Sequence, residues 1–156
     1  MKIRHSLFFA LVAASAVSLA SSAVSAVAAE TPFKGTLNAV ETSHLVFPIA
    51  SVDREGTGTA TYLGKYTEHA TLQVNVLFGS STGAATFTAA NGDTLTASVT
   101  GQSRLTSPGV LSIVEVYTIT GGTGRFAGAT GTLTLESTLN LATEASTGTF
   151  SGAIDH

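Results

Sequence analysis

The chain lacks cysteine and tryptophan altogether and contains only three prolines. Without cysteine there can be no disulfide framework, no cysteine nucleophile and no thiolate metal site. Basic residues are also scarce, with seven Lys and Arg against ten Asp and Glu. No basic stripe or polybasic patch is present, so neither nucleic-acid binding nor attraction to anionic lipid is expected.

A long hydrophobic run is also missing. The longest apolar stretch, residues 7–20, covers about 14 residues, whereas a membrane-spanning helix needs roughly 20. It follows Lys2 and Arg4 and precedes a stretch of small residues, the three-part pattern of a secretory signal peptide. We therefore predict a signal peptide over residues 1–29, cleaved near Ala28 or Ala29. The mature protein would be secreted or periplasmic, without a stable membrane anchor.

The remaining residues, 30–156, have the length of one domain and carry five basic against ten acidic residues, a net charge of −5. Threonine occurs 25 times and glycine 16 times in the chain, all of them in this part. Threonine is β-branched and suits a half-buried pleated sheet. This composition predicts strands rather than helices.

Alternation of side chains supports this prediction. Across residues 66–78, apolar side chains and Glu68 fall on one face and mostly polar ones on the other, the pattern of a strand with one buried side. Asn91-Gly92 lies between two alternating runs and predicts a hairpin, because both residues tolerate a positive φ. We interpret residues 44–49 as irregular or as an edge piece, and residues 53–55 as a solvated loop.

Seven or eight short strands with regularly spaced turns indicate an antiparallel sandwich or a closed barrel. Residues 33–37 and 150–154 have similar patterns, and pairing the first strand with the last would remove exposed edges. We therefore predict an all-β fold, a single eight-stranded antiparallel barrel.

Two glycine-rich strings imitate catalytic motifs. Residues 121–131 partly fit a dinucleotide-binding fingerprint, but a new strand begins where that motif needs a helix. Residues 79–83 spell a G-x-S-x-G nucleophile elbow, yet they lie between two predicted antiparallel strands. We interpret both strings as structural connections, the first with Phe126 folded back as a plug.

Two acidic residues share faces with apolar ones. Glu115 alternates in step with Ile113 and Tyr117, and Glu68 with Leu72. Each lies either at a solvated mouth or in an ion pair, or inside a pocket where desolvation would make it a candidate acid or base. We predict that Glu115 faces the interior. The histidines do not cluster, so no metal site is predicted.

The run 116–120 leading into the glycine string 121–131 resembles the signature of allene oxide cyclase and dirigent proteins. Residues 58–67 and 87–93 are similar to exported bacterial proteins of unknown role that share that barrel. The resemblance spans most of the mature chain and implies an eight-stranded antiparallel barrel of the calycin-like kind. It also implies an activity that depends on the shape of a pocket, as in steering a radical coupling or closing a ring, and by analogy a homotrimer.

Three functions remain open at this point. The first is binding of a small apolar molecule inside the barrel, with Tyr62, Tyr66 and Tyr117 as candidate ligand contacts. The second is a cofactor-free cyclase or isomerase, or a dirigent-like protein, with Glu115 and Glu68 as candidate catalytic residues. The third is a structural or surface-interaction protein whose barrel is filled by its own side chains. No cofactor is expected for any of them.

Overall fold

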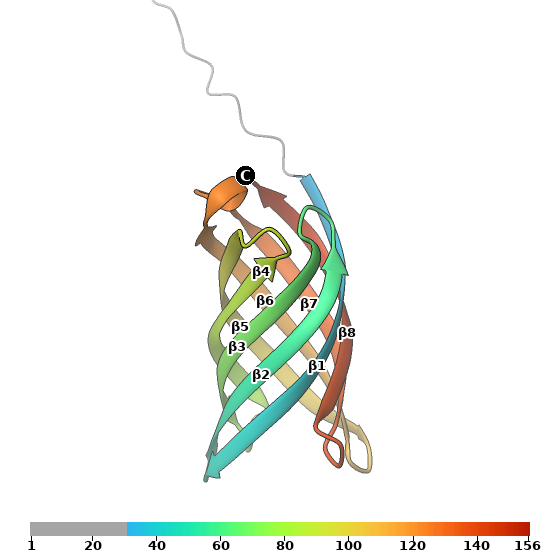
Figure 1. The fold of residues 1–156 in the computed structure, drawn as a ribbon. Helices are drawn as coiled ribbons and strands as arrows, with labels where there is room; N and C mark the ends of the chain where they lie inside the picture. Colours follow the sequence, from blue (N-terminus) through green and yellow to red (C-terminus); the bar gives the residue numbers. More distant parts are fainter. Residues whose placement is uncertain (1–30) are drawn as a thin grey trace, which may run out of the picture.

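The protein is an eight-stranded antiparallel barrel (Figure 1). The computed structural model describes residues 31–156, so the predicted signal peptide and its cleavage site lie outside the described residues. The strands are β1 (Thr31–Val46), β2 (Ile49–Ala60), β3 (Gly64–Asn75), β4 (Ser80–Ala89), β5 (Thr94–Ser107), β6 (Val110–Gly122), β7 (Thr130–Asn140) and β8 (Ala145–Asp155). No helix within this part of the chain is long and apolar enough to cross a bilayer.

Each strand pairs with its neighbour in sequence, and β1 also pairs with β8, from Thr31↔Ile154 to Val40↔Ala145. The predicted fold class and the predicted pairing of first and last strands are therefore confirmed. Closure leaves no unpaired sheet edge among the described strands, which a barrel of many threonines and few lysines would otherwise have to protect.

Two predictions about the first half of the barrel are wrong. Residues 44–49 are not irregular, because they form the end of β1, a tight turn at Phe47-Pro48 and the start of β2. Residues 53–55 are not a loop either, since they lie within β2, where Arg54 faces inward and is 1% exposed. The alternation that begins at Ala50 and Val52 continues through Arg54 without a break.

The strand faces follow the alternation of the sequence. In β3, Tyr66, Glu68, Ala70 and Leu72 are buried, whereas the residues between them are exposed. The Asn91-Gly92 hairpin joins β4 to β5 as predicted, although only Gly92 has a positive φ, so Asn91 does not adopt the left-handed conformation that it tolerates.

One end of the barrel is closed by its own side chains. The glycine-rich connection between β6 and β7 holds the single 3₁₀ turn of the described chain, η1 (Gly124–Phe126), and its Phe126 is fully buried as a plug. Below it, the Phe87 ring contacts the Tyr117 and Phe150 rings, with centroids 5.8 and 5.5 Å away. These aromatic side chains fill the closed half of the core.

Candidate functional site

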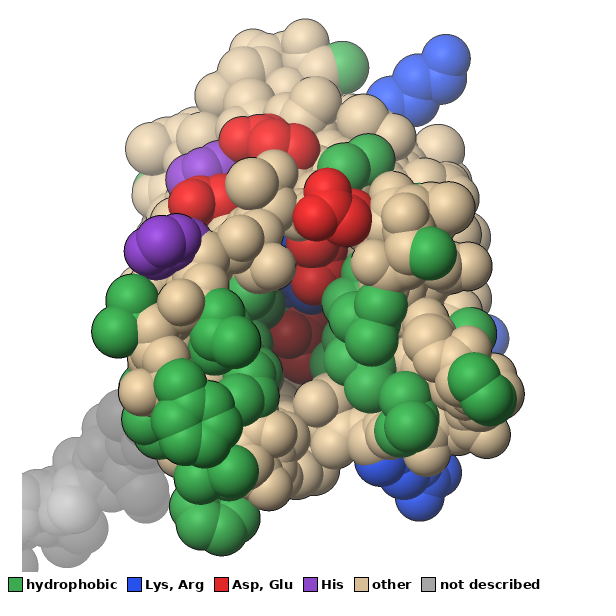
Figure 2. All heavy atoms as spheres, turned by 90° about the horizontal axis from the view of Figure 1, so that it is seen from below, with side chains coloured by type: hydrophobic (Ala, Val, Ile, Leu, Met, Phe, Trp, Pro, Cys, Tyr) green, Lys and Arg blue, Asp and Glu red, His purple; other side chains and the backbone are tan. Residues whose placement is uncertain are grey.

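The other end of the barrel is hollow. Figure 2 shows this end with acidic side chains deep in the hollow and hydrophobic side chains on both sides of it. The cavity has a volume of about 200 Å³. Its aliphatic walls include Val52, Leu72, Val74, Leu111, Ile113 and Leu139. This half of the barrel therefore has room that its own side chains leave unfilled.

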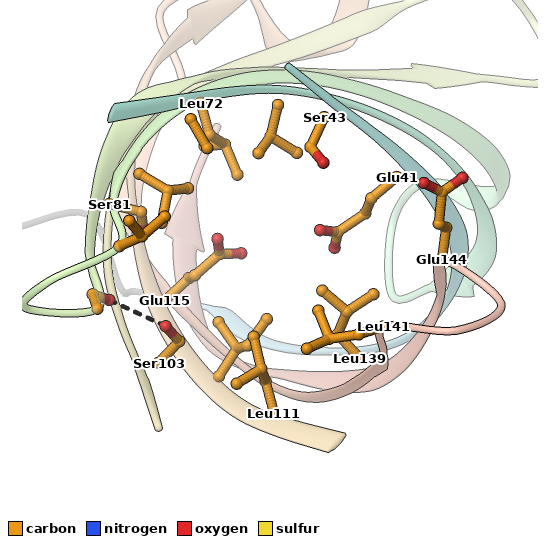
Figure 3. A pocket seen from close by; sticks show the side chains of 16 residues that line it. Glu41, Ser43, Leu72, Ser81, Ser103, Leu111, Glu115, Leu139, Leu141 and Glu144 are labelled. Carbon is orange, nitrogen blue, oxygen red and sulfur yellow. Dashed lines mark hydrogen bonds between the residues drawn. The ribbon is translucent and has the colours of Figure 1, made fainter. Parts of the chain in front are cut away.

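Two carboxyl groups point into the cavity from opposite walls. Glu41 extends from β1 and Glu115 from β6, and their carboxyl groups face each other across the space (Figure 3). Smaller polar groups on the walls are those of Ser43, Ser81 and Ser103. The cavity thus combines aliphatic walls with two convergent carboxyl groups, the usual composition of a small-molecule site.

Arg54 links these carboxyl groups beneath the cavity. Its Nη1 donates to Glu115 Oε2 at 2.9 Å and lies 3.8 Å from Glu41 Oε1. Its Nη2 donates to Glu68 Oε1 at 3.4 Å, and its Nε lies 3.3 Å from Glu68 Oε2. One buried guanidinium is therefore surrounded by carboxyl groups from three strands, β1, β3 and β6.

Tyr117 completes this cluster from β6. Its hydroxyl accepts a hydrogen bond from Arg54 Nη2 and lies 3.0 Å from Glu68 Oε1 and 3.2 Å from Glu115 Oε2. A phenol has one proton to donate, so it can serve only one of the two carboxyl groups at a time. We call Glu41, Arg54, Glu68, Glu115 and Tyr117 the carboxylate cluster.

Glycines make the space that these long side chains occupy. A Cβ on Gly56 of β2 would lie 2.6 Å from Leu37 Cδ1 and 3.1 Å from Glu68 Oε2. A Cβ on Gly101 of β5 would lie 2.7 Å from Glu115 Cγ. Gly56 points inward, but the space beside it is filled by the Leu37 and Glu68 side chains and is not part of the cavity.

Burial controls the titration of the cluster. Desolvation raises the pKa of Glu41 and of Glu68, and the attraction of Arg54 only partly opposes this effect. Burial would lower the pKa of Arg54, but the surrounding Tyr117, Glu68, Glu115 and Glu41 outweigh it and raise that pKa. Arg54 therefore stays charged, whereas Glu41 and Glu68 resist ionisation.

The hydrogen bonding of the cluster is incomplete at Glu41. Its buried Oε1 accepts no hydrogen bond from any described residue. The hydroxyl of Ser146 favours the ionised form of Glu41, yet its Oγ is likewise buried without a hydrogen bond of normal geometry. A buried polar atom without a partner costs stability, and this one lies on the Arg54 side of a carboxyl group that lines the cavity.

The predicted catalytic candidates both lie inside the barrel. Glu115 is 1% exposed and lines the cavity, so the predicted inward orientation is confirmed. Glu68 is equally buried but lies behind the cavity wall, hydrogen-bonded within the carboxylate cluster. Their chemical roles stay predictions.

None of the three tyrosines, all within the described residues, is among the residues that line the cavity. Tyr62 lies in the turn between β2 and β3 at the closed end, where its ring contacts His156 with centroids 4.9 Å apart. Tyr66 is buried in the core and donates from its hydroxyl to the Thr36 carbonyl at 2.8 Å. Tyr117 is the one of the three whose hydroxyl contacts a carboxyl group of the cavity wall, since it lies 3.2 Å from Glu115 Oε2.

Sequence reasoning missed two residues of the site. Arg54 was hidden between Asp53 and Glu55, since three adjacent charged residues suggest a solvated loop. Glu41 continues the inward alternation of Leu37 and Ala39 on β1. Extending the period-two pattern through each charged residue would have placed both side chains inside.

The rim around the cavity is apolar. Phe47, at the turn between β1 and β2, is 69% exposed, and Phe78, at the turn between β3 and β4, is 72% exposed. The other large exposed hydrophobic side chains at this end are Leu45, Val46, Ile49, Val76, Leu77, Leu105 and Leu141. Large exposed apolar patches on proteins mark sites of interaction, and hydrophobic side chains lie on both sides of the entrance of the cavity (Figure 2).

Comparison of the chain with known protein families, with curated proteins and with solved structures finds no match. The fold and the site together define a class of protein: a closed eight-stranded antiparallel barrel, filled at one end and hollow at the other, with a buried arginine–carboxylate cluster beneath the hollow.

Proposed function

We propose that this protein binds a small, largely apolar molecule in the open half of its barrel. The observation that carries the proposal is the cavity of about 200 Å³ with aliphatic walls. Transfer of an apolar molecule from water into such a space contributes about 25 cal/mol per Å² of buried apolar surface. The apolar side chains exposed at the rim can contact such a molecule as it enters the cavity.

The filled-barrel alternative fits the structure less well. The aromatic side chains that would fill the interior, Phe87, Tyr117 and Phe150, contact one another in the closed half of the barrel. Small and medium-sized side chains line the other half instead. A structural barrel gains nothing from this hollow, because an unfilled space lowers stability through lost packing contacts.

Binding of N-phenyl-1-naphthylamine, a small neutral dye that fluoresces in apolar surroundings, tests the proposal. We expect saturable fluorescence with the unaltered protein and its loss in Ala50→Phe, because Ala50 lines the cavity and a phenyl group would fill it. The matched control is Ser51→Phe on the same strand, whose side chain points outward. Dye binding that survives Ala50→Phe, or that is absent throughout, would contradict the proposal.

Native mass spectrometry of protein purified from its own host supplies an independent test. A retained ligand would appear as an added mass on the intact barrel, and Ala50→Phe should abolish it while Ser51→Phe keeps it.

A second candidate function is cofactor-free acid–base catalysis, of the cyclase, isomerase or dirigent-like kind. It is supported by Glu41, a carboxyl group on the cavity wall whose pKa is raised by burial, and by Glu115, which faces it from the opposite wall. The resemblance to allene oxide cyclase and dirigent proteins, which act by shaping a pocket, agrees with this reading.

Proton exchange at the α carbon of a probe ketone, 2-tetralone in D₂O, tests this second candidate. The unaltered protein should accelerate the exchange, and Glu41→Gln and Glu115→Gln should slow it, each relative to the exposed-residue variant Glu55→Gln. Equal exchange rates for all of these proteins would contradict the proposed acid–base catalysis and leave the proposed binding function unaffected.

Export is part of the same proposal. Residues 1–29 have the pattern of a signal peptide, so the protein recovered from the periplasm or the medium should begin at Ala29 or Glu30. Its intact mass checks this, and a mass that includes residues 1–28 would contradict it.

A further inference from the structure

The carboxylate cluster has more acidic groups than its one cation can neutralise. Glu41, Glu68 and Glu115 surround the single guanidinium of Arg54. That guanidinium is enclosed by the cluster, because Nη1 donates to Glu115, Nη2 donates to Glu68 and Tyr117, and Nε lies 3.3 Å from Glu68 Oε2 without a hydrogen bond of normal geometry. It is also 1% exposed, so it offers nothing to an anion that enters the cavity.

Glu41 is the member of the cluster whose side chain makes no hydrogen bond of normal geometry to the other four. It is only 9% exposed, its Oε1 accepts no hydrogen bond from the described residues, and that atom lies 3.8 Å from the nearest Arg54 contact, Nη1. The carboxyl group nevertheless points into the cavity, toward that of Glu115 (Figure 3). The polar wall of the cavity therefore consists mainly of the carboxyl groups of Glu41 and Glu115, whose oxygens can accept hydrogen bonds.

We infer that the natural ligand is an apolar amine, whose ammonium group lies between Glu41 and Glu115 and whose hydrocarbon part lies against the aliphatic walls. The inference rests on the proposed binding function and names the class of its ligand. An ammonium group has three N–H donors and no acceptor, so it matches a wall of carboxylate oxygens. Its positive charge would also favour the ionised form of Glu41, which burial otherwise disfavours.

Other head groups fit less well. A carboxylate or phosphate would approach Glu41 and Glu115 with like charge and find Arg54 enclosed. An alcohol can donate one hydrogen bond but leaves the excess of acidic groups unchanged. The apolar walls, including Val52, Leu72 and Ile113, favour a hydrocarbon body over a polar one such as a sugar.

Isothermal titration calorimetry with three probes of equal chain length tests the inference: n-octylammonium, 1-octanol and octanoate, at neutral pH. We expect octylammonium to bind about tenfold more tightly than octanol, because hydrogen bonds to charged groups are stronger than those between neutral ones. Octanoate should bind most weakly. In Glu41→Gln the preference for octylammonium over octanol should fall to about threefold or less.

The matched control is Glu55→Gln, which removes the same charge from the outer wall, where the Glu55 side chain is 74% exposed. Glu55→Gln should keep the full preference for octylammonium over octanol. This result would show that the preference comes from the carboxyl group in the cavity and not from the net negative charge of the protein. Glu41→Gln should fold, since it removes a buried acid that has an unsatisfied oxygen.

The possible results separate the inference from the function on which it rests. Octanol or octanoate binding as tightly as octylammonium, with all binding lost in Ala50→Phe, would overturn the amine inference and leave the binding function standing. An amine preference that is unchanged in Glu41→Gln would also overturn it. If none of the three probes nor N-phenyl-1-naphthylamine binds, the proposed function fails, and the inference with it.

Discussion

Arg54 holds together carboxyl groups that would otherwise repel one another inside the barrel, and its replacement by methionine tests this role. Met keeps an unbranched apolar stem but has no charged group, so Glu41, Glu68 and Glu115 would lose their cation. We expect Arg54→Met to lower the free energy of unfolding by about 3–5 kcal/mol at neutral pH, the usual cost of leaving buried charges unpaired. Chemical denaturation measures this loss.

The control for this prediction is Arg104→Met, which removes an exposed arginine from β5. Surface changes of this kind shift stability by about 0.5 kcal/mol or less. Equal effects of the two substitutions would show that the buried arginine contributes no more than an exposed one.

The buried acids Glu41 and Glu68 make stability depend on pH. Their pKa values are raised from an ordinary value of 4.5, so the folded protein binds more protons than the unfolded chain above that pH. Stability from these groups is fully present at and below pH 4.5 and is lost as pH rises through their raised pKa values. The free energy of unfolding should therefore fall as the pH rises above 4.5.

Two variants assign this pH dependence to the cluster. Glu41→Gln should make the fall above pH 4.5 less steep, because an amide does not titrate there, whereas Glu55→Gln should leave it unchanged. Unfolding free energies measured at several pH values give the slopes. A slope that is the same in Glu41→Gln and in the unaltered protein would contradict the assignment.

Among the elements, the β6–β7 connection is the one whose backbone most restricts the sequence. Gly124 has a φ of +57°, and a Cβ there would lie 1.9 Å from Asp93 Oδ1. Asp93 cannot move without cost, since its Oδ2 accepts a hydrogen bond from Asn91 at 2.8 Å and lies 3.8 Å from Arg125 Nε. This connection places the Phe126 plug.

Substitution of Gly124 by alanine should therefore destabilise the barrel by more than left-handed strain alone, which costs about 1–2 kcal/mol. Gly92→Ala is the matched comparison, because Gly92 has a φ of +89° but no atom within 4 Å of its added Cβ. Gly124→Val should be worse still. Thermal melts of the variants rank them, and equal losses at Gly92 and Gly124 would show that the contact with Asp93 is unimportant.

The inward and outward faces of the strands were predictable because apolar and polar side chains alternate along each strand. β3 shows this directly, with Glu68 among Tyr66, Ala70 and Leu72. Strand ends were less predictable, since threonine and glycine occur both within strands and in turns. The start of β4 at Ser80, within a string that looked like a turn, is an example.

At the scale of the whole molecule, the site could not be predicted because it depends on register. Glu41, Arg54, Glu68 and Glu115 come from four strands, and only the pairing around the barrel brings them together, as in Gly56↔Glu68 and Gly101↔Glu115. The sequence showed that Glu115 faces inward but not what it meets there. Nor did it show which half of the interior is filled.

Closure of the sheet makes a prediction that only the whole barrel can satisfy. In an open sheet the first and last strands are edges, and half of their amide groups exchange rapidly with solvent. Here β1 and β8 are joined along ten residue pairs, Thr31↔Ile154 to Val40↔Ala145, so their paired amides should be protected about as well as those between β3 and β4. Hydrogen–deuterium exchange followed by NMR measures both sets. Fast exchange confined to the β1–β8 seam would show that the barrel opens there in solution. That result would also remove the enclosed wall on which Glu41 faces the cavity, so the seam and the proposed binding site are tested together.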